Sequence, residues 1–230
     1  MSRTFKLGIV IPDANTTMEP ELPVWIPTKL ELRTVRVKRP GGMLRREDLP
    51  AELERVAQAG ADLAGFGPDL VVMGCTAAGF LAGPDGDAQF CERLSHTSGA
   101  PVVSAAGSMV KILREKKVSR VALVSPYGPL VNNALREFLA RTGFTITRFE
   151  GFEVAGIKEL LALRAQDVAD RARRAVTDDS QALFVACSQL PTYGALEQLE
   201  RETQRPAWSS VRAVAWNACQ TLGASFGDTQ

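Results

Sequence analysis

Two cysteines are the residues best suited to chemistry in this chain of 230 residues, because each ends an apolar run and precedes a hydroxyl residue. Cys75 follows the run LVVMG and precedes Thr76, while Cys187 follows LFVA and precedes Ser188, 112 positions later. A free thiol is only about 3% ionised at neutral pH, so a cysteine that acts as nucleophile or base needs help from its surroundings. We predict that a repeated fold brings both thiols to one cleft.

The hydroxyl residues after the cysteines indicate how the protein could stabilise an ionised thiol. If Thr76 and Ser188 each begin a helix, free backbone N–H groups and the helix dipole would stabilise a thiolate or a substrate carboxylate. Two such helix starts would form a cradle for a small dicarboxylate or an amino acid. A single cysteine at a strand end is more often a small core residue. We keep that interpretation for Cys91 and Cys219, which have no counterpart in the other half.

The elements around the cysteines predict two pseudo-symmetric α/β halves. Buried strands alternate with segments of helical periodicity, and this order occurs twice. Residues 7–12 (LGIVIP) match residues 121–126 (VALVSP) at an offset of 114, close to the offset between the cysteines. We expect residues 1–115 to form an N-terminal lobe and residues 116–230 a C-terminal lobe. Whether the C-terminal helix packs back on the first lobe stays open.

Strands that alternate with helices form mainly parallel sheets, which bind ligands beyond the carboxyl ends of their strands. Four polar or small-residue loops follow predicted strands, at residues 12–19, 75–79, 126–128 and 187–193. We expect these loops to converge on the cleft. In the second half, a helix over about residues 167–176 is expected to be capped by Asp167.

Composition excludes several classes of partner. The formal net charge is +1, which gives no electrostatic basis for binding nucleic acid or an anionic membrane surface. No apolar run has the length of a membrane span and the N-terminus lacks a signal-peptide pattern, so we expect a cytoplasmic protein. A single histidine, His96, and no C-x-x-C spacing argue against a zinc site. The expected partner is therefore a small molecule.

With these residues in view, the chain resembles the aspartate/glutamate racemase superfamily, in its branch of maleate cis-trans isomerases and arylmalonate decarboxylases. The resemblance rests on GIVIPDANTTME at residues 8–19 with Glu21 and Pro23, GCT at 74–76, SPY at 125–127 and ACS at 186–188. It implies two Rossmann-like lobes with the active site between them. It also implies that the protein uses neither a metal nor an organic cofactor, and that it forms a homodimer or a higher homo-oligomer.

The resemblance also assigns roles. Cys75 would add to the double bond of maleate, and Cys187 would donate and remove the proton at the other carbon, so that rotation about the single bond gives fumarate. Asn15 and Tyr127 match positions that hold the substrate carboxylates. Thr76 and Ser188 would supply neighbouring donors.

One position departs from the isomerase pattern and leaves the substrate open. Isomerases carry a further carboxylate-binding asparagine where this chain has FEVAGIK at residues 152–158, with Lys158 as a candidate substitute. A two-thiol racemase or epimerase of aspartate, glutamate or an N-modified acidic amino acid is therefore an alternative, with Asp13 as the candidate partner of the ammonium group. Arylmalonate decarboxylases typically keep only the second thiol, so Cys75 argues against that reaction. A non-catalytic carboxylate-binding protein is a further alternative.

Overall fold

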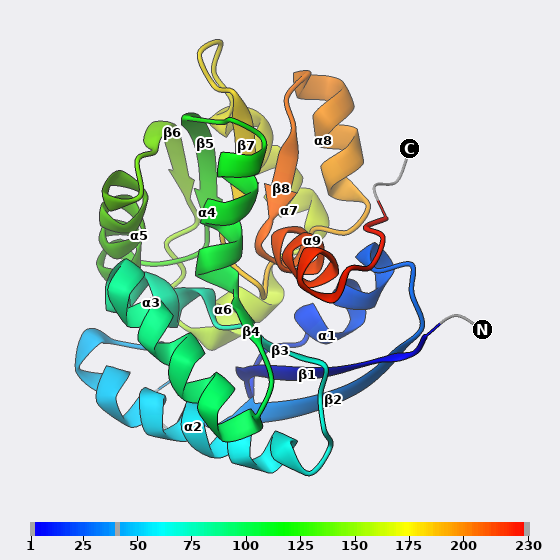
Figure 1. Ribbon diagram of the computed structural model, residues 1–230. Helices are drawn as coiled ribbons and strands as arrows, with labels where there is room; N and C mark the ends of the chain where they lie inside the picture. Colours follow the sequence, from blue (N-terminus) through cyan, green and yellow to red (C-terminus); the bar gives the residue numbers. More distant parts are fainter. Residues whose placement is uncertain (1–2, 40–41, 228–230) are drawn as a thin grey trace.

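A computed structural model describes residues 3–39 and 42–227, which form two four-stranded sheets flanked by helices (Figure 1). The outer ends of the predicted lobes, residues 1–2 and 228–230, lie outside the described residues. The strand orders are β2-β1-β3-β4 and β6-β5-β7-β8, and all pairs are parallel. The equivalent orders confirm the predicted fold class of two pseudo-symmetric α/β halves.

The first sheet consists of β1 (Phe5–Pro12), β2 (Leu30–Val37), β3 (Leu70–Met73) and β4 (Val102–Ser104). Between β1 and β2 lie α1 (Met18–Glu21) and the 3-10 helix η1 (Leu22–Trp25). The 3-10 helix η2 (Arg46–Asp48) and α2 (Leu49–Ala64) precede β3, and α3 (Thr76–Ser98) joins β3 to β4. Helix α4 (Ala105–Glu115) then leads to the second sheet.

The second sheet consists of β5 (Arg120–Ser125), β6 (Thr145–Gly151), β7 (Ala182–Val185) and β8 (Ala207–Ser209). Its helices are α5 (Pro129–Arg141), α6 (Ile157–Ala162), α7 (Ala165–Ala175), α8 (Ala195–Thr203) and α9 (Ser210–Leu222).

The expected cap of α7 is wrong in one detail. Arg164 is the N-cap, and Asp167 lies three residues later, where its carboxylate accepts a hydrogen bond from the Arg164 N–H at 2.9 Å. Asp167 therefore acts as the acidic member of a capping box rather than as the cap itself.

The cysteine-bearing strands occupy central positions in their sheets. All four residues of β3 and all four of β7 are buried, as expected for parallel strands covered by helices on both faces. β3 lies between β1 and β4, and β7 lies between β5 and β8. Both apolar runs therefore end at the carboxyl end of a central strand. The residues that follow are anchored by strands on both sides.

The last helix packs beside the helix that joins the two halves. α9 contacts η1 and lies beside α4 (Figure 1). The N-caps of α4 and α9 are equivalent serines. The Ser104 hydroxyl accepts from the N–H of Gly107 at 2.9 Å, and the Ser209 hydroxyl accepts from that of Arg212 at 3.1 Å. We propose a lobe boundary between residues 115 and 116, at the connection from α4 to β5.

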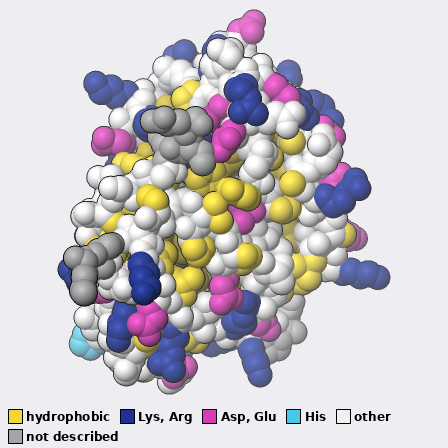
Figure 2. All heavy atoms as spheres, turned by 90° about the vertical axis from the view of Figure 1, so that its right-hand side faces the viewer, with side chains coloured by type: hydrophobic (Ala, Val, Ile, Leu, Met, Phe, Trp, Pro, Cys, Tyr) yellow, Lys and Arg dark blue, Asp and Glu magenta, His cyan; other side chains and the backbone are white. Residues whose placement is uncertain are grey.

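Charged side chains of both signs are interspersed on the face shown in Figure 2, without a patch of one sign across it. Within residues 3–39 and 42–227, none of the helices is both long enough and apolar enough to span a bilayer.

Candidate active site

The six residues predicted from the sequence line one pocket, which holds about 510 Å³ of empty space including its opening to solvent. They follow β1, β3, β5 and β7, so both halves of the molecule contribute. Their roles in catalysis and binding remain predictions. The six are Asn15, Cys75, Thr76, Tyr127, Cys187 and Ser188.

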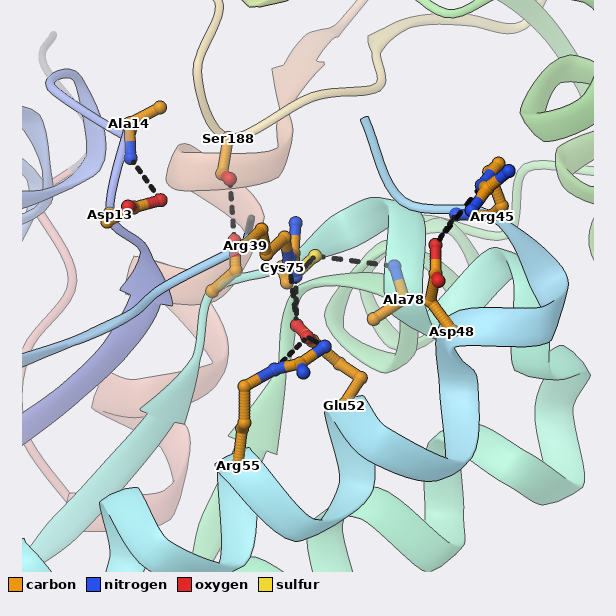
Figure 3. A network of polar contacts seen from close by, with 11 residues as sticks. Asp13, Ala14, Arg39, Arg45, Asp48, Glu52, Arg55, Cys75, Ala78 and Ser188 are labelled. Carbon is orange, nitrogen blue, oxygen red and sulfur yellow. Dashed lines mark hydrogen bonds and ion pairs between the residues drawn. The ribbon is translucent and has the colours of Figure 1, made fainter. Parts of the chain in front are cut away.

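Cys75 lies at the start of a helix and beside a positive charge. It is the N-cap of α3, and its thiol accepts from the N–H of Ala78 at 3.4 Å. The Arg39 Nη2 donates to the Cys75 Sγ at 2.9 Å (Figure 3). The helix start predicted at Thr76 is therefore present. The guanidinium of Arg39, which the sequence did not predict, contacts the same thiol.

Arg39 is itself held by a buried carboxylate. Its Nε donates to Glu52 Oε1 at 2.9 Å, and its Nη2 donates to the same oxygen. Glu52 lies in the first turn of α2, and its other oxygen accepts from the Arg55 Nη2 at 3.0 Å. Burial opposes the charge on Arg39, but the proximity of Cys75 and Glu52 outweighs it and raises the pKa of Arg39. Arg39 is therefore a permanent cation at the Cys75 thiol.

The helix start predicted at Ser188 is wrong. Ser188 lies in a turn, and the next helix, α8, begins only at Ala195. The backbone after Cys187 is used instead to contact the loop that follows β1, since the Thr17 hydroxyl donates to the carbonyl of Gln189 at 2.7 Å. A backbone committed to contacts across the cleft cannot also enter a helix at this point.

The Cys187 thiol is surrounded by neutral donors. It accepts from the Tyr127 hydroxyl and from the backbone N–H groups of Gln189, at 3.4 Å, and Leu190. Burial raises the pKa of Cys187, and these hydrogen bonds offset only part of that effect. Burial, followed by the proximity of Cys187, also raises the pKa of Tyr127. Both groups are therefore protonated at neutral pH.

Asn15 is fixed in a position from which it can hold a ligand. Its Oδ1 accepts from the N–H groups of Thr17 at 3.1 Å and Met18 at 3.0 Å. Its Nδ2 donates to the Ser188 hydroxyl at 3.1 Å. An asparagine amide has two N–H donors, so one remains for a molecule in the pocket.

The two predicted hydroxyl donors tie the halves together. The Ser188 hydroxyl donates to the carbonyl of Gly74 at 2.5 Å, so its proton is used within the protein (Figure 3). The Thr76 hydroxyl accepts from the N–H of Ser188 at 3.3 Å and bonds the Tyr127 hydroxyl. These bonds link Thr76, Tyr127 and Cys187 in a chain of neutral groups.

One wall of the pocket is apolar. It is formed by side chains of α6 and of the segment after β2, namely Met43, Leu44, Ile157, Leu160 and Leu161. Lys158, the suggested substitute for an asparagine, is exposed and is not among the described residues that line the pocket. None of those described lining residues is Asp or Glu.

Sequence reasoning missed Arg39, Gln189 and the apolar wall. Arg39 lies in a stretch, RTVRVKR at residues 33–39, in which no local feature separates one arginine from the others. Within the part of the chain that the structure describes, no group of three or more His, Cys, Asp or Glu side chains is placed to hold a metal ion.

Comparison with known proteins places this geometry in a family. A model of the arylmalonate decarboxylase family matches residues 7–228. A maleate isomerase of Nocardia farcinica is 29% identical over 235 residues, covering 94% of this chain and 90% of the relative.

Two solved structures share the fold. One is a mutant maleate cis-trans isomerase of Nocardia farcinica with a covalently bound succinylcysteine intermediate, at a TM-score of 0.87, 25% identity and coverage of 96% and 94%. The other is a maleate isomerase of Pseudomonas putida, at 0.90, 21% and coverage of 96% and 94%. Because the family model spans nearly the whole chain, this protein belongs to the arylmalonate decarboxylase family, in the branch with the maleate isomerases.

Proposed function

We propose that this protein isomerises maleate, or a similar small cis-dicarboxylate, to its trans form without a cofactor. The observation that carries the proposal is that Cys75 and Cys187, with opposite electrostatic surroundings, line one pocket. The similarity to proteins named maleate isomerase, one of them solved with a succinylcysteine intermediate, supports it.

The proposed reaction uses the two thiols in turn. The Cys75 thiolate adds to one alkene carbon, and the π electrons move to the other carbon, which takes a proton from the Cys187 thiol. The product is a succinyl thioether with a carbon–carbon single bond, about which the adduct rotates. The Cys187 thiolate then removes a proton from the same carbon, the double bond re-forms, and the Cys75 thiolate leaves. Both thiols return to their starting states.

We propose that the substrate carboxylates are held by Asn15 and Tyr127, with Thr76 and Ser188 as supporting residues. The free N–H of Asn15 supports its part. The Tyr127 hydroxyl donates to Cys187, which supports a role beside the proposed proton donor, and its O–H would turn to the carboxylate when substrate binds. By family resemblance, we further propose a homodimer that works in the cytoplasm.

The charge of the pocket favours a dicarboxylate over an amino acid. A racemase substrate carries an ammonium group, which needs an acidic partner when it is buried. The described lining residues include Arg39 but no Asp or Glu. Asp13, the candidate partner, is exposed, and its carboxylate accepts from the N–H of Ala14 at 3.1 Å.

Incubation with maleate, followed by proton NMR, tests the proposal, and the expected result is conversion to fumarate. Parallel samples with aspartate and glutamate in deuterated water, and with an arylmalonate, test for racemisation and decarboxylation. Exchange of the α-hydrogen or release of CO₂ without fumarate formation would replace the proposal with one of the alternatives.

A further inference from the structure

The surroundings of Cys75 contain more positive than negative charge when the thiol is protonated. Two guanidinium groups, of Arg39 and Arg55, share the single carboxylate of Glu52. Glu52 is 1% exposed and the Arg39 side chain 11%, so water screens this cluster weakly. A thiolate at Cys75 would balance the charge, because the cluster would then hold two cations and two anions.

We propose that Arg39 is a further catalytic residue, which keeps Cys75 ionised before the substrate arrives, and that Glu52 is the positioning residue that aims the guanidinium at the sulfur. The use of the thiolate as a nucleophile rests on the proposed function. The ionisation itself does not, because it follows from the contacts within the protein.

The geometry brings a cation into direct contact with the thiol. The Arg39 Nη2 lies 2.9 Å from the sulfur, and it bonds Glu52 as well, so the guanidinium bridges the two (Figure 3). An opposite charge at such a distance favours the ionised form of an acid over its neutral form. The Ala78 N–H at the start of α3 adds a further donor.

The other groups that face Cys75 do not cancel this effect. From the second half, Tyr127 and Cys187 approach it, and the raised pKa of each keeps it neutral. From α2, the negative charge of Glu52 is shared between Arg39 and Arg55. Among these groups, Arg39 is therefore the charged one in direct contact with the sulfur.

Arg39 also serves the second half of the reaction. When the thiolate adds to the alkene, its charge passes to the substrate, and Arg39 is left beside a neutral thioether. The positive charge then favours the return of electrons to the sulfur, so that the Cys75 thiolate leaves as the double bond re-forms.

The rate at which iodoacetamide alkylates Cys75, followed by peptide mass spectrometry from pH 5 to 10, tests the inference without any substrate. We expect Arg39→Met to lower the rate at pH 7 at least about tenfold, to move the pH midpoint upward by about one unit or more, and to leave the rate at pH 10 unchanged. Arg39→Lys keeps the charge and should recover part of the reactivity. Arg45→Met, which removes an exposed arginine from the same connection, is the matched control and should behave as the native protein.

A second variant separates positioning from charge. Glu52→Asp keeps the negative charge but shortens the side chain by one methylene, which draws Arg39 away from the sulfur. We expect a rate at pH 7 about threefold below that of the native protein, with a midpoint between those of the native protein and Arg39→Met. If the Glu52 contact were only structural, Glu52→Asp would lower the melting temperature and leave the midpoint unchanged.

An unchanged midpoint in Arg39→Met would overturn the inference, even if KM for maleate rose, because Arg39 would then act only as a carboxylate ligand. Fumarate formation with an unchanged midpoint would leave the proposed function standing and remove the role of Arg39. If the midpoint depends on Arg39 but the protein does not convert maleate, the role of Arg39 stands and the proposed function is wrong.

Discussion

The surroundings of the two thiols differ although the strands that carry them are equivalent. Cys75 caps a helix and accepts a hydrogen bond from a cation, whereas Cys187 precedes a turn and accepts only from neutral donors. The repeated fold therefore supplies two matched positions, and residues outside the repeat make them chemically unlike. One position suits an anionic nucleophile, and the other suits a thiol that keeps its proton.

The largest effect that would sharpen this comparison is expected for Cys75→Ala, which removes the proposed nucleophile. We expect kcat/KM for maleate to fall on the order of 10⁴-fold or more, because Cys187, the other thiol among the described residues of the pocket, has a pKa that burial raises and stays protonated. Cys91→Ala, in the half-buried part of α3, is the control and should keep its activity. Steady-state kinetics that show similar losses in both variants would remove Cys75 from the mechanism.

Loss of the proton donor should have a smaller effect. Cys187→Ser keeps a hydroxyl of similar size but a much weaker acid, so we expect kcat to fall about 10² to 10⁴-fold, as for the loss of a general acid. The pH dependence of Cys75 alkylation should change little, since we propose that Arg39, in contact with the sulfur, controls that thiol. A large shift of the Cys75 midpoint in this variant would show that the two sites ionise together rather than separately.

The pH profile should respond to Tyr127→Phe in a defined direction. The Tyr127 hydrogen bond lowers the pKa of Cys187, so its loss raises that pKa further above the ordinary value. In the proposed reaction Cys187 acts in its protonated form, so activity is present below its pKa and is lost as the pH rises through it. We expect the alkaline limb of kcat to move upward by up to about one unit, while activity at neutral pH falls about tenfold.

Tyr193→Phe, an exposed tyrosine against Trp25, is the control for that profile. An alkaline limb that moves downward in Tyr127→Phe, or one that moves equally in both variants, would contradict the assignment of the limb to Cys187.

The smallest effect concerns the contacts that hold the two sites together. Ser188→Ala leaves the buried Gly74 carbonyl without its hydroxyl donor, which should cost about 1–3 kcal/mol in the free energy of unfolding. Chemical denaturation would measure it, with the exposed Ser119→Ala as control. Equal stability of both variants would show that this link between the halves contributes nothing.

The sequence predicted the symmetric part of the site better than the asymmetric part. Cys75 and Cys187 end apolar runs in central strands, and a periodic pattern identifies such positions. The same periodicity cannot report that Arg39 turns toward a sulfur 36 positions later, since that contact depends on the path of the chain after β2.

The error at Ser188 has a related cause. A hydroxyl residue after a strand is a common helix start, and Thr76 behaves as expected. After Cys187, the carbonyl of Gln189 instead accepts from the Thr17 hydroxyl, and the Ser188 hydroxyl donates to the carbonyl of Gly74. Thr17 and Gly74 both belong to the other half. Contacts between distant segments override a local signal of this kind.

The most direct test is to trap the covalent intermediate in Cys187→Ala and to map it. With maleate, this variant has the nucleophile but lacks the thiol that exchanges the proton. A water molecule in place of the missing thiol would protonate the carbanion slowly and leave as hydroxide, and no thiolate is present to remove that proton again, so the succinyl adduct should accumulate over a long incubation. Peptide mass spectrometry should place one succinyl group on Cys75, with none on Cys91 or Cys219. An adduct on either of those cysteines, or no adduct while Cys75 stays reactive toward iodoacetamide, would contradict the assignment of Cys75 as nucleophile and Cys187 as proton donor.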